Sequence, residues 1–106
     1  MFLIWSVIRV DSSSLHHIVL MKFLERSDAF EAKRKLLEMA DSVPQISTIA
    51  IELDEAGTEV SYDLCMTTVH DSAEALRGYQ AHPAHLELAA WLVPRLADRA
   101  VVDYRR

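Results

Sequence analysis

Residues 16–24, with the sequence HHIVLMKFL, decide the fold that the chain favours. Nearly every position is apolar, whereas a strand that buries only one face alternates apolar and polar residues. We therefore expect a central strand that packs on helices with one face and on a second copy of the sheet with the other. Because successive side chains alternate between faces, one face carries His17, Val19, Met21 and Phe23, and the other carries Ile18, Leu20, Lys22 and Leu24.

The stretch that follows predicts a helix over residues 28–43, because apolar side chains recur there every three or four positions. Asp28 and Glu31 have the spacing of a capping box, in which side chains satisfy free N–H groups at a helix start. Pro44 ends the helix. The predicted buried stripe consists of Phe30, Leu36, Leu37, Ala40 and Val43, with the stem of Lys33 along it.

Two more strands are predicted at residues 46–53 and 60–69, and the turn residues 54–58 between them favour a hairpin. Asp71 and Glu74 repeat the capping-box spacing and start a second helix that ends near Tyr79. Pro83 starts a third helix, because proline suits the first turn, and residues 100–104 form a last strand. The apolar stripe predicted for the third helix is Leu86, Ala89, Ala90 and Val93.

This order of elements is that of a ferredoxin-like α+β sandwich, with a four-stranded antiparallel sheet and helices on one face. Such an arrangement leaves the other face of the sheet bare. An exposed apolar sheet face marks an interface. We therefore expect a homodimer that closes through the open sheet face into a dimeric α/β barrel.

The bulk composition fits one ordinary globular domain, since 51% of the 106 residues are hydrophobic and 25% are charged. A net charge of -5 argues against a nucleic-acid partner. Residues 1–14 are interpreted as an N-terminal extension, and residues 15–106 as the domain. The apolar start of the extension has no basic segment before it and is shorter than the ~20 residues of a membrane helix, so no membrane partner is expected.

Cofactor and metal sites have little support in the sequence, so none is expected. The chain has two glycines, Gly57 and Gly78, far apart, which excludes a glycine-rich phosphate loop. His82 and His85 are three positions apart, but His82 is expected to lie outside the helix, so they are not predicted to share a metal ion. The single cysteine, Cys65, excludes a disulfide within the chain and suits a reducing cytoplasm.

Candidate chemistry is concentrated at residues 79–85, YQAHPAH, which place a phenol and two imidazoles at the predicted corner between two helices. His85 is a candidate general base, because a helix start lowers the pKa of a histidine. Tyr79 is a candidate donor to a substrate oxygen that becomes negative. His17, on the helix-facing side of its strand, is a candidate ligand-positioning residue. His82 is a candidate for ligand binding or for tying the corner.

Several motifs together resemble the stress-responsive A/B barrel (Dabb) domain family over residues 15–106. The chain has its opening strand in HIVLMKF at 17–23 and its V-P-x-I turn at 43–46, with Gln45 in place of the usual glycine. It has the third-strand sequence YDL at 62–64. The signature Y-x-x-H-P-x-H stands at 79–85, and Asp103-Tyr104 matches the closing strand. The resemblance implies a homodimeric α+β barrel.

The resemblance also implies a chemistry. A plant polyketide cyclase of the family, which makes olivetolic acid, uses a tyrosine and a histidine in a cofactor-free aldol condensation. By similarity these roles fall on Tyr79 and His85, and that of a pocket histidine falls on His17. A further pocket histidine of the cyclase falls on Leu64.

Three functions remain open. The first is a small apolar or carbonyl-containing ligand in a pocket between sheet and helices, with cofactor-free, cyclase-like acid/base chemistry. The second is a non-catalytic, stress-associated structural or binding dimer, and the third a cofactor-free monooxygenase-like enzyme. An enzyme predicts a cavity of about 300 Å³ or more into which Tyr79 and His85 both point. A structural role predicts that both are hydrogen-bonded to the protein instead.

Overall fold

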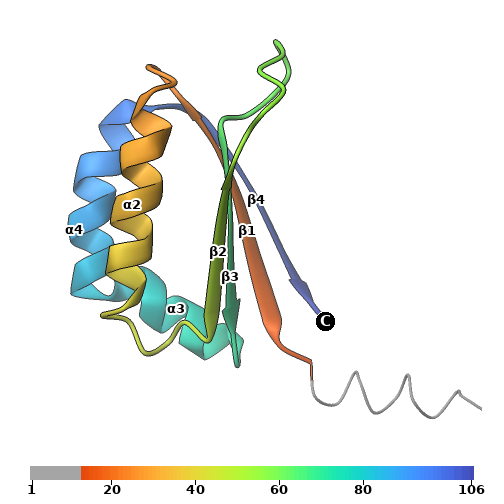
Figure 1. Ribbon diagram of the computed structural model, residues 1–106. Helices are drawn as coiled ribbons and strands as arrows, with labels where there is room; N and C mark the ends of the chain where they lie inside the picture. Colours follow the sequence, from red (N-terminus) through yellow and green to blue (C-terminus); the bar gives the residue numbers. More distant parts are fainter. Residues whose placement is uncertain (1–12) are drawn as a thin grey trace, which may run out of the picture.

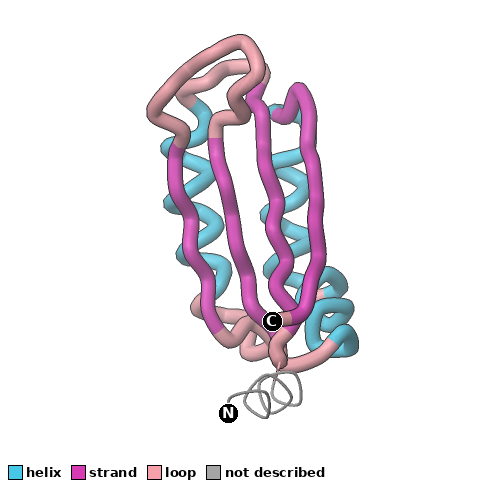
Figure 2. Tube along the Cα trace, turned by 90° about the vertical axis from the view of Figure 1, so that its right-hand side faces the viewer, coloured by secondary structure: helices cyan, strands magenta, loops and turns pink. Residues whose placement is uncertain are grey.

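The computed structural model describes residues 13–106. Most of the proposed extension, residues 1–14, therefore lies outside the described residues. Four strands form one antiparallel sheet in the order β2-β3-β1-β4, and three helices lie against one face of it (Figures 1 and 2). The strands are β1 (Leu15–Phe23), β2 (Thr48–Leu53), β3 (Leu64–His70) and β4 (Leu96–Arg105). The helices are α2 (Asp28–Ala40), α3 (Ala73–Ala81) and α4 (Pro83–Leu92), followed by a 3-10 turn, Val93–Arg95.

This arrangement is the expected ferredoxin-like α+β sandwich. β1 is central, and its side chains alternate strictly between buried and half-buried. The buried set faces the helices and includes His17, Val19 and Met21. The other face of the sheet carries no helix (Figure 2). Where β1 pairs with its neighbours, that bare face presents an apolar strip of Ile18, Leu20, Val69, Ala100 and Val102.

The buried faces of the helices differ from the predicted stripes. In α2 the buried residues are Ala29, Ala32, Leu36 and Met39, whereas Phe30 is 69% exposed. In α4 they are Leu88 and Leu92, while Leu86 is exposed. The prediction from Phe30 and Leu86 was therefore wrong by part of a turn. In α2 the buried face includes the small residues Ala29 and Ala32, and the larger Phe30 lies on the exposed side.

The predicted capping boxes are also absent from the helix starts. α2 begins after Ser27 with no side-chain cap, and Glu31 pairs with Arg34 instead, at 2.6 Å. α3 is capped by Ser72, whose hydroxyl accepts a hydrogen bond from the N–H of Ala75 at 3.0 Å. Ser72 has the β conformation that an N-cap needs, so the helix starts one residue later than Asp71 would set it.

The starts of β3 and β4 differ most from the prediction. β3 starts at Leu64, not at Val60, because the carboxylate of Asp63 is buried and turned inward, where the backbone N–H of Phe23 donates to it at 2.8 Å. Residues 60–63 therefore belong to the loop. β4 is longer than predicted and begins at Leu96, since it pairs with β1 along its whole length. This longer strand brings Arg99 into the sheet.

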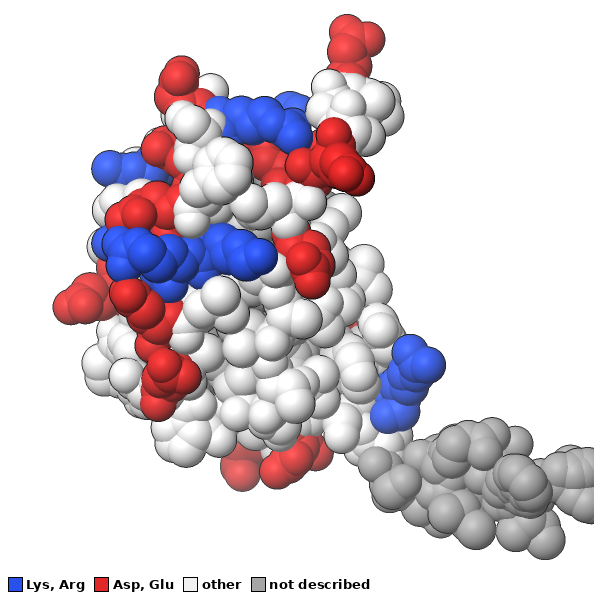
Figure 3. Space-filling view, viewed as in Figure 1, with Lys and Arg blue, Asp and Glu red and all other residues white. Residues whose placement is uncertain are grey.

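The surface over the helices carries both signs of charge. Arg34 of α2 pairs with Glu31 and Glu38, and on the face shown in Figure 3 the Lys and Arg side chains lie beside Asp and Glu side chains. None of the helices in residues 13–106 has the length and apolar character needed to cross a membrane.

Candidate functional site

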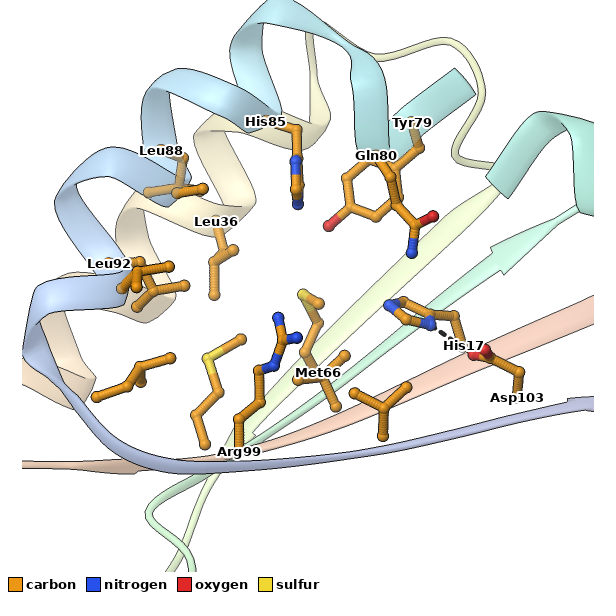
Figure 4. A pocket seen from close by; sticks show the side chains of 16 residues that line it. His17, Leu36, Met66, Tyr79, Gln80, His85, Leu88, Leu92, Arg99 and Asp103 are labelled. Carbon is orange, nitrogen blue, oxygen red and sulfur yellow. Dashed lines mark hydrogen bonds and ion pairs between the residues drawn. The ribbon is translucent and has the colours of Figure 1, made fainter. Parts of the chain in front are cut away.

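A cavity of about 320 Å³ lies between α4 and the sheet, with α3 at one end (Figure 4). Most of its wall is apolar and comes from β1, β3, α2 and α4. Leu36, Met66, Leu88 and Leu92 are examples. The polar groups that line it are His17, Tyr79, Gln80, His85, Arg99 and Asp103. An apolar wall with a few convergent polar groups is typical of small-molecule sites.

Tyr79 closes the α3 end of this cavity. Its side chain is 1% exposed, and its ring stacks on His70, with the centroids 5.3 Å apart, and meets His85 edge-on at 4.8 Å. The hydroxyl points into the cavity (Figure 4), and no group of residues 13–106 hydrogen-bonds to it. Burial raises the pKa of Tyr79 to about 12. The phenol is therefore neutral at physiological pH and has a proton to donate to a ligand.

His85 points into the same cavity from the first turn of α4 (Figure 4). Its Nδ1 is buried and makes no hydrogen bond within the described part of the chain, so Nε2, at the tip of the ring, is the atom offered to a ligand. Burial lowers the pKa of His85, and the nearby His17 and Arg99 lower it further, while the backbone of Gln80 acts in the opposite direction. A neutral imidazole with a free nitrogen is a competent base.

His17 lies on the floor of the cavity, paired with Asp103 across the β1–β4 ladder. The two residues are register partners, and Nδ1 of His17 is 2.5 Å from Oδ1 of Asp103. His17 is buried, whereas 43% of the Asp103 side chain is exposed. The carboxylate fixes the orientation of the imidazole and leaves Nε2 of His17 free to meet a ligand.

His70 supports Tyr79 from behind and was not predicted as part of the site. It is fully buried, with Nδ1 2.7 Å from the carbonyl oxygen of Gln45 and Nε2 2.8 Å from the hydroxyl of Thr68. Because a carbonyl only accepts, Nδ1 carries the proton and the Thr68 hydroxyl donates to Nε2. Burial lowers the pKa of His70. The neutral ring is thus held as a fixed platform for the phenol.

The structure does not bring His82 to the cavity. His82 sits between α3 and α4, and its Nδ1 accepts a hydrogen bond from the N–H of Ala84 at 3.0 Å, which caps α4. His82 therefore ties the corner between the two helices, which is one of the two roles predicted from the sequence. The candidate residues that do meet at one cavity are His17, Tyr79 and His85.

Three polar residues of the site were missed from the sequence: Gln80, Arg99 and Asp103. Arg99 fell outside the predicted last strand, which was placed at residues 100–104. The pairing of Met21 with Arg99 and of His17 with Asp103 puts both β4 residues on the helix-facing side. A correctly extended strand would have shown this, since residues 99, 101 and 103 alternate onto one face.

These features define a class: a ferredoxin-like α+β domain with a polar-tipped cavity between its sheet and its helices. Residues 15–106 match the family described as Stress responsive A/B Barrel Domain, or Dabb. The chain belongs to this family. No curated protein matches the sequence at a significant level.

Solved structures share the fold. A dimeric ferredoxin-like protein of unknown function from Thermobifida fusca has a TM-score of 0.78 and 23% identity, covering 90% of this chain and 92% of that chain. A Dabb family protein from Mesorhizobium loti has a TM-score of 0.69 and 20% identity over 87% and 95% of the two chains. The hydroxynitrile lyase of Passiflora edulis has a TM-score of 0.77 and 14% identity over 90% and 94%.

Proposed function

We propose that the protein binds a small carbonyl compound in the cavity and catalyses cofactor-free acid/base chemistry on it, of the cyclase-like kind. One observation carries the proposal: the Tyr79 hydroxyl and the His85 imidazole point into one apolar cavity of about 320 Å³ (Figure 4), and neither is used by the protein's own hydrogen bonds within residues 13–106. The Tyr79 hydroxyl and Nε2 of His85 are therefore both available to a ligand in the cavity.

The chemistry follows from the states of the two groups. Nε2 of His85, neutral because its pKa is lowered, removes a proton from the carbon next to the carbonyl group. The electron pair of that C–H bond moves to the carbonyl oxygen and gives an enolate. The Tyr79 hydroxyl, whose pKa of about 12 keeps it protonated, donates to that oxygen. The enolate carbon then attacks a second carbonyl or takes the proton back from His85.

His17 has a positioning role in this proposal. It lies beside Tyr79, with ring centroids 6.4 Å apart, and Asp103 holds its ring. A second polar contact from the floor of the cavity fixes which carbon of the ligand faces His85. Such orientation contributes strongly to catalysis, because the reaction rate falls steeply when the reacting atoms are misplaced.

We also propose that the working unit is a homodimer that closes through the bare sheet face, and that the chain resides in the cytoplasm. The apolar strip of Ile18, Leu20, Val69, Ala100 and Val102 supports the dimer. Burial of such an apolar strip between two chains would stabilise the dimer. The single cysteine supports the location.

Exchange of a C–H proton in D₂O tests the chemistry. Phenylpyruvate is a suitable probe, because it carries a ketone next to an exchangeable CH₂ group. We expect the protein to accelerate loss of the CH₂ signal in proton NMR spectra. His85→Asn should slow the exchange about a hundredfold, as removal of a general base does. Tyr79→Phe should slow it by about the same factor, as for one lost oxyanion donor.

Matched variants control for general damage. His82→Asn makes the same change three residues away and keeps a capping side chain, and Tyr62→Phe removes a hydroxyl that contacts Asp98 outside the cavity. Both should exchange phenylpyruvate at the wild-type rate. Binding without accelerated exchange would favour the non-catalytic binding dimer. Exchange that survives in His85→Asn would disprove the assigned base.

A further inference from the structure

Among the described residues that line the cavity, Arg99 is the one strongly charged group that the proposed chemistry does not use. It belongs to β4 and is the register partner of the buried Met21, so its side chain lies on the helix-facing side of the sheet. Figure 4 shows its guanidinium extending up from β4 into the cavity, toward the end of the His85 side chain. The groups around it are mainly apolar, among them Met21, Met66 and Leu36.

No carboxylate of residues 13–106 forms an ion pair with Arg99. Asp103, the one acidic residue that lines the cavity, is engaged by His17. Asp98, the neighbour of Arg99 in sequence, accepts a hydrogen bond from Tyr62 at 2.8 Å. The guanidinium stays charged at neutral pH. Arg99 is exposed, lines the cavity and has no countercharge from the described chain.

We infer that Arg99 binds a carboxylate of the ligand, so that the substrate class is a small oxo acid and not a neutral ketone. The inference rests on the proposed function and names the substrate class of that same site. A guanidinium and a carboxylate form two parallel hydrogen bonds. Arg99 is an exposed residue at the border of the cavity, so it can meet a carboxylate that enters from the solvent. A carboxylate fits better than a phosphate group, because the cavity lining within residues 13–106 includes one arginine and no lysine.

The position of Arg99 also sets the orientation of the ligand. The Tyr79 hydroxyl and the His85 imidazole approach from the helices, whereas Arg99 approaches from β4 (Figure 4). A carboxylate held at Arg99 places the neighbouring carbon chain between the sheet and the two helical groups. The positive charge of Arg99 is close enough to His85 to contribute to its lowered pKa. Because both side chains also line the same cavity (Figure 4), one ligand can contact both groups.

An acid–amide pair tests the inference. Phenylpyruvate and phenylpyruvamide have nearly the same shape and differ in the charge at one end. With the full 106-residue chain, titration followed by NMR should show that the acid binds about tenfold more tightly than the amide, or better. Arg99→Gln should remove the preference. Arg105→Gln makes the same change on the same strand outside the cavity and should keep it.

The outcomes separate this inference from the proposed function. Equal affinity of wild type for the acid and the amide overturns the carboxylate role of Arg99 and leaves the cavity proposal intact. If Arg99→Gln still binds the acid more tightly than the amide, the carboxylate role of Arg99 is also overturned. If the NMR signals of the residues that line the cavity respond to neither compound, both proposals are overturned. The comparison of acid with amide in the wild type decides the point even if Arg99→Gln does not fold, and a retained preference in Arg99→Lys would support the charge as its cause.

Discussion

At the scale of single residues, the protein uses its histidines in different ways. His70 and His82 have partners in the chain, as a platform for Tyr79 and as a helix cap, whereas His85 has a buried nitrogen without one. The sequence could indicate Tyr79, His85 and His17 as candidates, because a short motif and strand alternation place them. It could not indicate His70, because the role of this residue depends on the Tyr79 ring that stacks on it from α3.

The lowered pKa values of His70 and His85 make stability depend on pH. In the unfolded chain a histidine titrates near 6.5, and in the folded protein both titrate lower because of burial. Between those values the unfolded state binds more protons. The free energy of unfolding should therefore be highest above about pH 6.5 and should fall as the pH decreases toward the folded pKa values. Urea unfolding at about pH 7.5 and about pH 5.5 measures the difference.

Proton NMR titration of the imidazole C2–H signals gives the site-specific version. The signals of His70 and His85 should both have midpoints below 6.5, the ordinary histidine value. A midpoint above it for either would contradict the burial argument. The exchange reaction should retain activity below pH 6.5 for the same reason, since the base stays neutral there.

At the scale of the elements, the order and type of helices and strands could be predicted from the sequence. The phase of the helices, meaning which of their faces is buried, could not. The prediction for α2 gave weight to the largest side chains, including Phe30. The structure buries Ala29 and Ala32 instead. Both stripes have helical spacing, so periodicity alone cannot choose between them. The choice depends on how closely the helix approaches the sheet, and only the small residues reveal it.

Adjacent leucines in α2 test that phase directly. Leu36 is 2% exposed and Leu37 is 38% exposed. Leu36→Ala should lower the free energy of unfolding by about 2–3 kcal/mol, at the low end for buried leucines because it already borders a cavity. Leu37→Ala should cost less than about 1 kcal/mol. Urea unfolding of the two variants gives both values, and equal losses would contradict the observed phase.

A pair of serines tests the helix starts in the same way. Ser72 accepts a hydrogen bond from Ala75, whereas Ser27 makes no cap bond. Ser72→Ala should therefore lower the free energy of unfolding by about 1 kcal/mol. Ser27→Ala should lower it by less, because no hydrogen bond is lost. Thermal and urea unfolding measure the two effects, and a larger loss at Ser27 would show that the caps are misassigned.

At the scale of the whole molecule, one sheet serves two purposes. Its helix-covered face forms the cavity, and its bare face forms the apolar strip around Ile18 and Leu20. The near-continuous apolar sequence of β1 predicts this double use, because apolar residues on both faces of a strand indicate that both faces are buried. The shape and size of the cavity could not be predicted, since they depend on the long β4 strand and on the helix phases together.

The bare face predicts the assembly state. Light scattering during gel filtration should give twice the chain mass of 12.0 kDa for the wild type. Ile18→Glu should shift the protein toward the monomer, because it places a charge in the apolar strip. Leu37→Glu, on the exposed side of α2, should not. A wild-type chain that stays monomeric and folded at micromolar concentration would rule out the sheet-face dimer.

The most direct test of the central claim, that the cavity is a ligand site served by Tyr79 and His85, is a crystal structure of the protein soaked with phenylpyruvate. We predict ligand density in the cavity, with its ketone oxygen within hydrogen-bond distance of the Tyr79 hydroxyl, its CH₂ carbon next to Nε2 of His85 and its carboxylate on Arg99. Density elsewhere on the molecule, or an empty cavity with Tyr79 and His85 turned toward the protein interior, would contradict the claim.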